Sequence, residues 1–188
     1  VIVHVLCDGR RYEGELDVVT GLLPGEDERE LWVLSHLYEP LADDNSAGVA
    51  SSIEVARVLK TLAARGDIPV LHFTLRLVFA SEMYGFAAFA DHMGGCLRGR
   101  AIGAINTDGI TAQARAATAF LAPPGSPFFG DYIMEHVLET QGPSTGITFR
   151  LRERGAYQDD MFLSDSTTGV PTIWVLGDRR LWHNSAQD

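Results

Sequence analysis

The chain has 188 residues, which is enough for one domain with a sizeable hydrophobic core. Hydrophobic residues make up 46% of it and charged residues 21%, as in an ordinary globular protein, and no apolar run approaches the length that spans a membrane. The formal net charge of −10 argues against a protein that binds nucleic-acid phosphates. We therefore expect neither a nucleic acid nor a membrane as a partner.

The ends of the sequence and its cysteines give weaker indications. The sequence begins with Val1 rather than Met and stops at Asp188, so we expect residues 1–188 to be one domain taken from a longer protein. Cys7 and Cys96 lack the spacing of a metal site and allow at most one disulfide. The compartment and the oligomeric state stay undetermined, with the cytoplasm as the default expectation.

The first part of the chain predicts extended segments. Residues 2–6 form a short apolar run that predicts a strand, and residues 13–23 predict a second extended segment that ends at a Pro-Gly turn. Residues 27–30 are acidic, and we expect them to be exposed. The apolar run at residues 31–34 predicts a strand that ends just before His36.

The next connection leads into an amphipathic helix and contains a histidine, two aspartates and an asparagine. Apolar residues recur at helical spacing from Val49 to Ala63, and Gly66 stands where a C-terminal cap is expected. An imidazole and hard carboxylates at such a turn suit a divalent metal such as zinc. The alternative is that the polar residues of the turn only cap the helix; these residues are Asp44, Asn45 and Ser46.

Strands and helices continue to alternate along the rest of the chain. Further strands are predicted at residues 70–80, 101–105, 147–151 and 171–176. Further helices are predicted at residues 85–93 and from residue 129 to a stop at Gly142-Pro143. Residues 111–122 have no clear period, and residues 152–160 predict a polar loop. This order predicts an α/β fold: a three-layer sandwich whose mixed, mostly parallel central sheet has helices on both faces.

Side chains that can bind a metal follow several of the predicted strands. His36, Glu82 and Asp108 each come directly after an apolar run, and His183 comes a short loop after the last one. Ligands of open α/β sheets bind beyond the carboxyl ends of the strands, so these residues and Asp44 can converge on one site. The simpler alternatives are a hydrogen-bonded loop histidine, a turn-forming aspartate and a helix-start glutamate.

With these five sequence features in order, the chain resembles a family of zinc aminopeptidases. The family includes bacterial leucyl aminopeptidases, glutamate carboxypeptidase and glutaminyl cyclases, and the chain looks most like a divergent aminopeptidase-like branch. The resemblance extends from about residue 31 to residue 188. The matching features are His36, the turn from Asp44 to Gly48, Glu82-Met83-Tyr84-Gly85, Asn106-Thr107-Asp108 and His183.

The resemblance implies a zinc site of one or two ions, with cobalt or manganese as substitutes. It makes Asp44 a carboxylate shared by two metals, with His36 and Asp108 on one ion and His183 on the other. It also makes Glu82 either the general base or a metal ligand that replaces a missing one. The chain departs from the family at Met83, where the family has a second, ligating glutamate, because a thioether is a poor zinc ligand beside carboxylates. Tyr38 stands where the family has an acidic residue, two positions after the first histidine.

Three functions follow as hypotheses. The first is a metal-dependent aminopeptidase that removes N-terminal residues from a peptide substrate with a metal-activated water. The second is a degenerate peptidase fold that acts as a binding domain, and the third is a single-zinc enzyme of the glutaminyl cyclase kind. Two neighbouring residues, Asp159 and Asp160, either line a pocket for the substrate amine or belong to a solvated loop.

Overall fold

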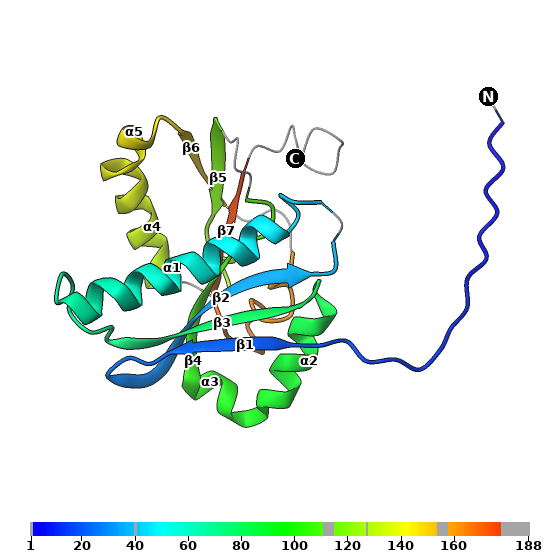
Figure 1. Cartoon of the computed structure of the whole chain (residues 1–188), viewed down its shortest axis with the longest axis horizontal. Coiled ribbons are helices and arrows are strands. Elements are labelled where there is room, and N and C mark those ends of the chain that lie inside the picture. The colour runs from blue at the N-terminus through cyan, green and yellow to red at the C-terminus, as the bar shows by residue number, and fades with distance from the viewer. Residues whose placement is uncertain (1, 40, 111–114, 127, 154–157, 178–188) are drawn as a thin grey trace.

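In the computed structural model, the described residues form one mixed sheet of seven strands (Figure 1). The structure describes residues 2–39, 41–110, 115–126, 128–153 and 158–177. The strands are β1 (Val19–Leu23), β2 (Asp27–Leu37), β3 (Phe73–Ser81), β4 (Ala101–Asn106), β5 (Ala116–Phe120), β6 (Thr148–Arg152) and β7 (Thr172–Leu176). The helices are α1 (Ser46–Arg65), α2 (Tyr84–Met93), the 3-10 turn η1 (Gly94–Cys96), α3 (Leu97–Arg100), α4 (Phe129–Thr140) and α5 (Gly142–Thr145).

The strand order is β1-β3-β2-β4-β7-β5-β6. The neighbours β3, β2, β4 and β7 run parallel to one another, whereas β1 is antiparallel to β3 and β5 is antiparallel to β7. The sheet is therefore mixed and mostly parallel, and helices lie on both of its faces (Figure 1). The predicted α/β fold is confirmed.

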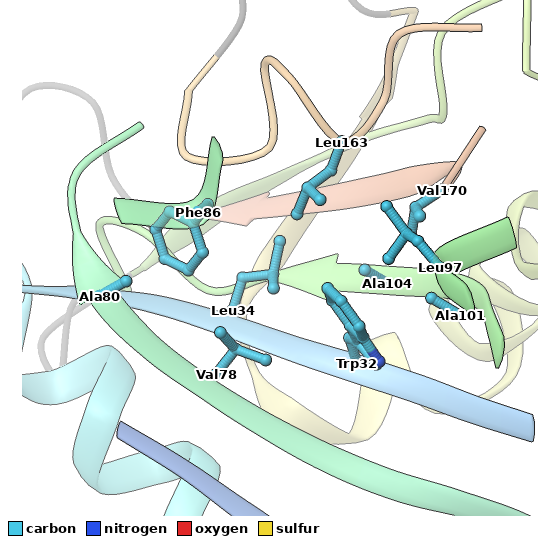
Figure 2. Close-up of a cluster of buried hydrophobic side chains, with 10 residues drawn as sticks. All are labelled: Trp32, Leu34, Val78, Ala80, Phe86, Leu97, Ala101, Ala104, Leu163 and Val170. Atoms are coloured by element: carbon cyan, nitrogen blue, oxygen red, sulfur yellow. The ribbon is translucent and has the colours of Figure 1, made fainter. Parts of the chain in front are cut away.

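Alternate residues of β2 point to opposite faces of the sheet, and each face meets different helices. Trp32 and Leu34 belong to the larger buried cluster (Figure 2), where they meet Phe86 of α2 and Leu97 of α3. On the other face, Ser35 contacts Ser52 of α1 through their hydroxyl groups. The central strand β2 is thus covered on both sides, and its last residues lie under the first turn of α1.

The helix predicted from the apolar spacing between Val49 and Ala63 is confirmed, and it is longer than that spacing indicated. It runs over Ser46–Arg65, and Gly66 closes it in the left-handed conformation, with φ 76°. Only Gly48 and Ser52 of this helix are fully buried. None of the helices in the described part of the chain has the length and apolar character needed to cross a membrane.

Of two expectations for the N-terminal region, the first is wrong and the second is confirmed only in part. Residues 2–6 form no strand: they are exposed and lie in an extended segment that projects from the body (Figure 1), with no described strand beside them to complete a ladder. The extended segment predicted at residues 13–23 is a strand only over Val19–Leu23. Cys7 in this region and Cys96 in η1 are both free and exposed, so the described structure forms no disulfide.

Strand β5 was not predicted from the sequence, because it is made mostly of small residues. The segment at residues 111–122 contains β5, Ala116–Phe120, while residues 111–114 lie outside the described part. Alanine has little preference for strands, so β5 depends on its neighbours β6 and β7 for hydrogen bonds rather than on its own pattern. Gly142, predicted to stop α4, begins the short helix α5.

The expected exposure of residues 27–30 is wrong for Glu30, which is fully buried. Its carboxylate accepts hydrogen bonds from Arg76 at 2.6 and 2.8 Å, from Arg100 at 2.8 Å and from the indole of Trp32 at 2.8 Å. Burial alone would raise the pKa of Glu30, but hydrogen bonds and the charges of both arginines outweigh it and lower the pKa. Glu30 thus ties β2 to β3 and α3 at the end of the sheet opposite His36.

We predict that Glu30→Gln lowers the free energy of unfolding by about 3–5 kcal/mol, because it leaves the buried Arg76 without its counter-charge. Chemical denaturation near neutral pH measures this. Glu54→Gln is the matched control, since its ion pair with Arg57 is exposed and screened by solvent and should contribute little to stability. Equal effects of the two substitutions would show that the buried ion pair does not hold these elements together.

Candidate metal centre

The predicted site residues gather at the carboxyl end of the parallel strands. His36 is the second-last residue of β2, and Glu82 directly follows β3. Asp108 lies two residues after β4, whose last residue, Asn106, pairs with Leu34 of β2. Asp44 comes from the turn that leads into α1. His183 lies outside the described residues.

Three of these side chains form one buried cluster. His36, Asp44 and Asp108 each offer a ligand atom, and these atoms lie within 4.8 Å of one another. Nε2 of His36 is 3.1 Å from Oδ1 of Asp44, and Nδ1 of His36 is 3.7 Å from Oδ1 of Asp108. All three residues are 3% exposed or less, so water cannot solvate their charges freely.

The donor atoms of this cluster suit a divalent cation. Among the described residues, neither Nε2 of His36 nor Oδ1 of Asp108 has a hydrogen-bond partner, although both atoms are buried. Buried polar atoms are normally hydrogen-bonded, so an exception needs an explanation such as an ion. An imidazole nitrogen with carboxylate oxygens is a donor set that zinc accepts. The residues present therefore fit a zinc-type metal.

The turn before α1 supports the cluster of His36, Asp44 and Asp108 rather than only capping the helix. Asn45 is the N-cap residue, but its side chain makes no capping hydrogen bond. In the orientation that satisfies both of its ends, the amide accepts the His36 backbone N–H at 3.1 Å and donates to the Thr107 carbonyl at 3.2 Å. A Cβ on Gly48 would lie 2.6 Å from the backbone carbonyl oxygen of Thr107, so a glycine is required there. The capping interpretation of Asn45 is therefore wrong.

The turn after β4 directs Asp108 into the same site. The side chain of Asn106 accepts the backbone N–H of Asp108 at 2.9 Å, which is an Asx turn formed by Asn106 rather than by Asp108. The hydroxyl of Thr107 contacts those of Ser35 and Ser52 at 2.5 and 3.3 Å. These buried contacts join β2, α1 and the β4 loop directly behind the cluster.

Asp159 and Asp160 lie in the segment before β7, and both are fully buried. Asp159 accepts a hydrogen bond from Nδ1 of His36 at 3.2 Å and one from the Met83 backbone N–H at 3.4 Å. Asp160 accepts hydrogen bonds from Asn106 and Ser164. A solvated loop is therefore wrong here, and neither carboxylate is open to a substrate amine.

Glu82 and Met83 form the turn between β3 and α2. Glu82 is half-buried, and Met83 has a positive φ of 49°, an uncommon backbone conformation outside glycine. Burial raises the pKa of Glu82; the charge of His36 opposes this, while the carboxylates of Asp159, Glu39 and Asp44 add to it. A carboxyl group with a raised pKa is suited to exchanging protons near neutral pH.

The carboxylates around His36 shift each other's titration. Burial alone would lower the pKa of His36, but the hydrogen bond to Asp159 and the nearby carboxylates of Asp44 and Asp108 raise it to about 11. Burial and the neighbouring carboxylate of Asp159 raise the pKa of Asp108. Burial also raises the pKa of Asp159. Negative charge is thus concentrated where only one described cationic side chain, His36, is in contact with it.

The family expected from the sequence is confirmed. The profile described as Peptidase family M28 matches residues 18–188, so this chain belongs to peptidase family M28. The match begins before residue 31, where the sequence resemblance was placed, and includes β1. No curated protein matches the chain.

Solved structures agree with this fold. A candidate peptidase from Clostridium acetobutylicum is 18% identical, with a TM-score of 0.73 over 91% of this chain and 38% of that protein. The glutaminyl cyclase of Porphyromonas gingivalis is 19% identical, with a TM-score of 0.66 over 92% of this chain and 68% of that protein. BSAP, a zinc aminopeptidase from Bacillus subtilis, is 18% identical, with a TM-score of 0.60 over 85% of this chain and 39% of that protein. The chain thus spans less than half of the first and third of these proteins.

We predict that the metal-free protein loses thermal stability as the pH rises from about 6.5 to about 8.5. Because the pKa of His36 rises from 6.5 to about 11 on folding, the folded state binds more protons in this range. This stabilisation is complete below pH 6.5 and is lost as the pH approaches 11. The raised pKa values of Asp108 and Asp159 act in the same direction from lower pH.

Thermal melting of chelator-treated protein at several pH values measures this, with His36→Asn as the control that removes the main titrating group. The slope with pH should be smaller in His36→Asn. Added zinc replaces bound protons, so its stabilising effect should grow with pH. A metal-free protein whose melting temperature rises over this range would contradict the assigned electrostatics.

Proposed function

We propose that this chain forms the metal centre of an aminopeptidase that hydrolyses the N-terminal residues of peptides. The observation that carries the proposal is the buried cluster of His36, Asp44 and Asp108 at the carboxyl end of the parallel strands. Membership of peptidase family M28 supports a peptidase-type metal enzyme. The proposed cofactor is zinc, with cobalt or manganese as substitutes, and His183 is proposed as a further ligand.

The chemistry divides between the cation and the protein. A bound zinc ion supplies a Lewis acid, which brings the pKa of a water molecule near neutrality and polarises a carbonyl group. Glu82 is the proposed general base, because it follows β3 beside the cluster and its pKa is raised. It would accept the proton of the attacking water and deliver it to the amine of the departing peptide.

A hollow of about 270 Å³ next to the cluster is the proposed place for the first substrate residue. His36 and Asn45 form its inner end, and Val49 and Ile53 of α1 give it an apolar wall. Glu39, which is exposed, lies at the same hollow and could face the cationic amino terminus of a peptide. A small apolar hollow with one carboxylate is consistent with an enzyme that acts at a chain end.

A second candidate is a single-zinc enzyme that cyclises N-terminal glutamine. Met83 favours it, because a thioether stands where the family has a second glutamate ligand. Within the described residues, the cluster offers three ligand atoms, which is enough to begin one metal centre but not two.

We predict that the zinc- or cobalt-loaded protein releases the amine from amino-acid anilides and that His36→Ala loses both metal and activity. Elemental analysis and turnover should be measured on the same samples. His72→Ala is the matched control, because His72 is exposed and lies just before β3, at the opposite end of that strand from Glu82. Metal content that is unchanged in His36→Ala would overturn the proposed centre. Cyclisation of a glutaminyl peptide without anilide hydrolysis would select the second candidate. If the protein shows neither activity, the chain would be a metal-binding domain without catalysis.

We also predict that Glu82→Gln keeps its bound metal and loses about 10²–10⁴-fold in turnover, the usual contribution of a general base. A ligand behaves differently, since its loss lowers metal content. Glu39→Gln is the control for charge near the hollow, and it should alter KM more than kcat. Full activity of Glu82→Gln would exclude Glu82 as the base, and a loss of metal would make it a ligand.

A further inference from the structure

The two ring nitrogens of His36 face different groups. Nε2 lies 3.1 Å from Asp44 and has no hydrogen-bond partner among the described residues. Nδ1 forms a hydrogen bond with Oδ2 of Asp159 at 3.2 Å, whereas Oδ1 of Asp108, at 3.7 Å, is beyond hydrogen-bond distance from it. One nitrogen is therefore held by the carboxylate of Asp159, while the other faces Asp44 of the cluster.

Asp159 is itself fixed on both of its oxygens. Oδ2 contacts His36, and Oδ1 accepts the Met83 backbone N–H at 3.4 Å. The side chain is fully buried, and it comes from a segment 123 residues away from His36 in the sequence. The carboxylate therefore joins the ends of β2 and β3 and cannot turn away without losing one of its two partners.

The residues beside His36 in the sequence do not supply such a carboxylate. Tyr38 is 60% exposed, and its hydroxyl accepts the backbone N–H of Asp17 at the surface. Glu39 is exposed and lies at the adjoining hollow. Within the described residues, the hydrogen bond to Nδ1 of His36 thus comes from Asp159 and from no local acidic residue.

We infer that Asp159 is the positioning residue of the metal centre. It accepts the Nδ1–H of His36, which keeps the proton on Nδ1 and leaves the lone pair of Nε2 for the metal. A carboxylate on the far nitrogen of a ligating histidine fixes the ring orientation and increases the basicity of the ligand. This inference rests on the proposed metal centre. It assigns Asp159 a role behind the ligands rather than among them or in a substrate pocket.

Zinc titration of the metal-free protein tests the inference through affinity. Asp159→Asn keeps the shape of the side chain and should weaken zinc binding by about 10–100-fold. Asp160→Asn is the matched control: it removes a neighbouring buried carboxylate that contacts Asn106 and Ser164 rather than His36. It should bind zinc nearly as tightly as wild type. Equal losses in both variants would mean that general negative charge, not the bond to Nδ1, is what matters.

Nitrogen-15 NMR of histidine-labelled, zinc-loaded wild type is a second measurement that does not depend on any variant folding. His36 should carry zinc on Nε2 and a strongly deshielded proton on Nδ1. In Asp159→Asn, that proton should shift upfield, because the acceptor is then neutral. Zinc on Nδ1 would overturn the inference.

The same experiments separate the inference from the function on which it rests. If His36→Ala binds zinc as tightly as wild type, the proposed metal centre is wrong. If His36→Ala loses zinc but Asp159→Asn does not, the metal centre stands and only the role of Asp159 falls. If Asp159→Asn lowers the number of bound ions rather than the affinity, Asp159 is a ligand and the positioning role is wrong.

Discussion

The site depends on one electrostatic constraint: three carboxylates contact a single histidine where water is largely excluded. His36 lies within 3.7 Å of Asp44, Asp108 and Asp159, and all four residues are buried. Like charges in a medium of low dielectric repel strongly, so the group must take up protons or a cation. The raised pKa values of Asp108 and Asp159 mean that these carboxylates take up protons more readily, which reduces the repulsion. A bound divalent ion would also neutralise the carboxylates, and it is the alternative that peptidase chemistry would use.

Strand β2 connects this buried cluster to the hydrophobic core. Residues 30, 32, 34 and 36 point to one face of the sheet, since side chains alternate along a strand. The first and last of them, Glu30 and His36, are buried charged or polar groups, and Trp32 and Leu34 between them are core residues. Glu30 meets two arginines, whereas His36 meets three carboxylates. Strand β2 is thus anchored at one end by the ion pairs of Glu30. At its other end it carries His36, whose surrounding carboxylates favour a bound cation.

How far the sequence predicts this structure depends on whether a feature is local. The helix after Asn45 and the positions of His36 and Asp108 at strand ends could be predicted, because apolar periodicity and strand ends are local signals. The burial of Glu30 could not, because its partners Arg76 and Arg100 lie 46 and 70 residues away. The contact between His36 and Asp159 is longer still, at 123 residues, and only the adjacent pair of aspartates hinted at it. Charged residues in a single sequence do not reveal whether they are solvated or paired in the core.

Met83 separates this chain from the family pattern, and the inferred role of Asp159 gives the departure a physical context. The methionine side chain cannot complete a second zinc site, but its backbone N–H holds Asp159, which in turn holds His36. In the proposed centre, position 83 would therefore support His36 through its main chain, although it offers no ligand itself. Glu82 belongs to the same turn, so the carboxylate that orients His36 also restrains the backbone next to the proposed base. A single ion, one positioned histidine and one glutamate would then form a self-consistent centre without the family's second glutamate.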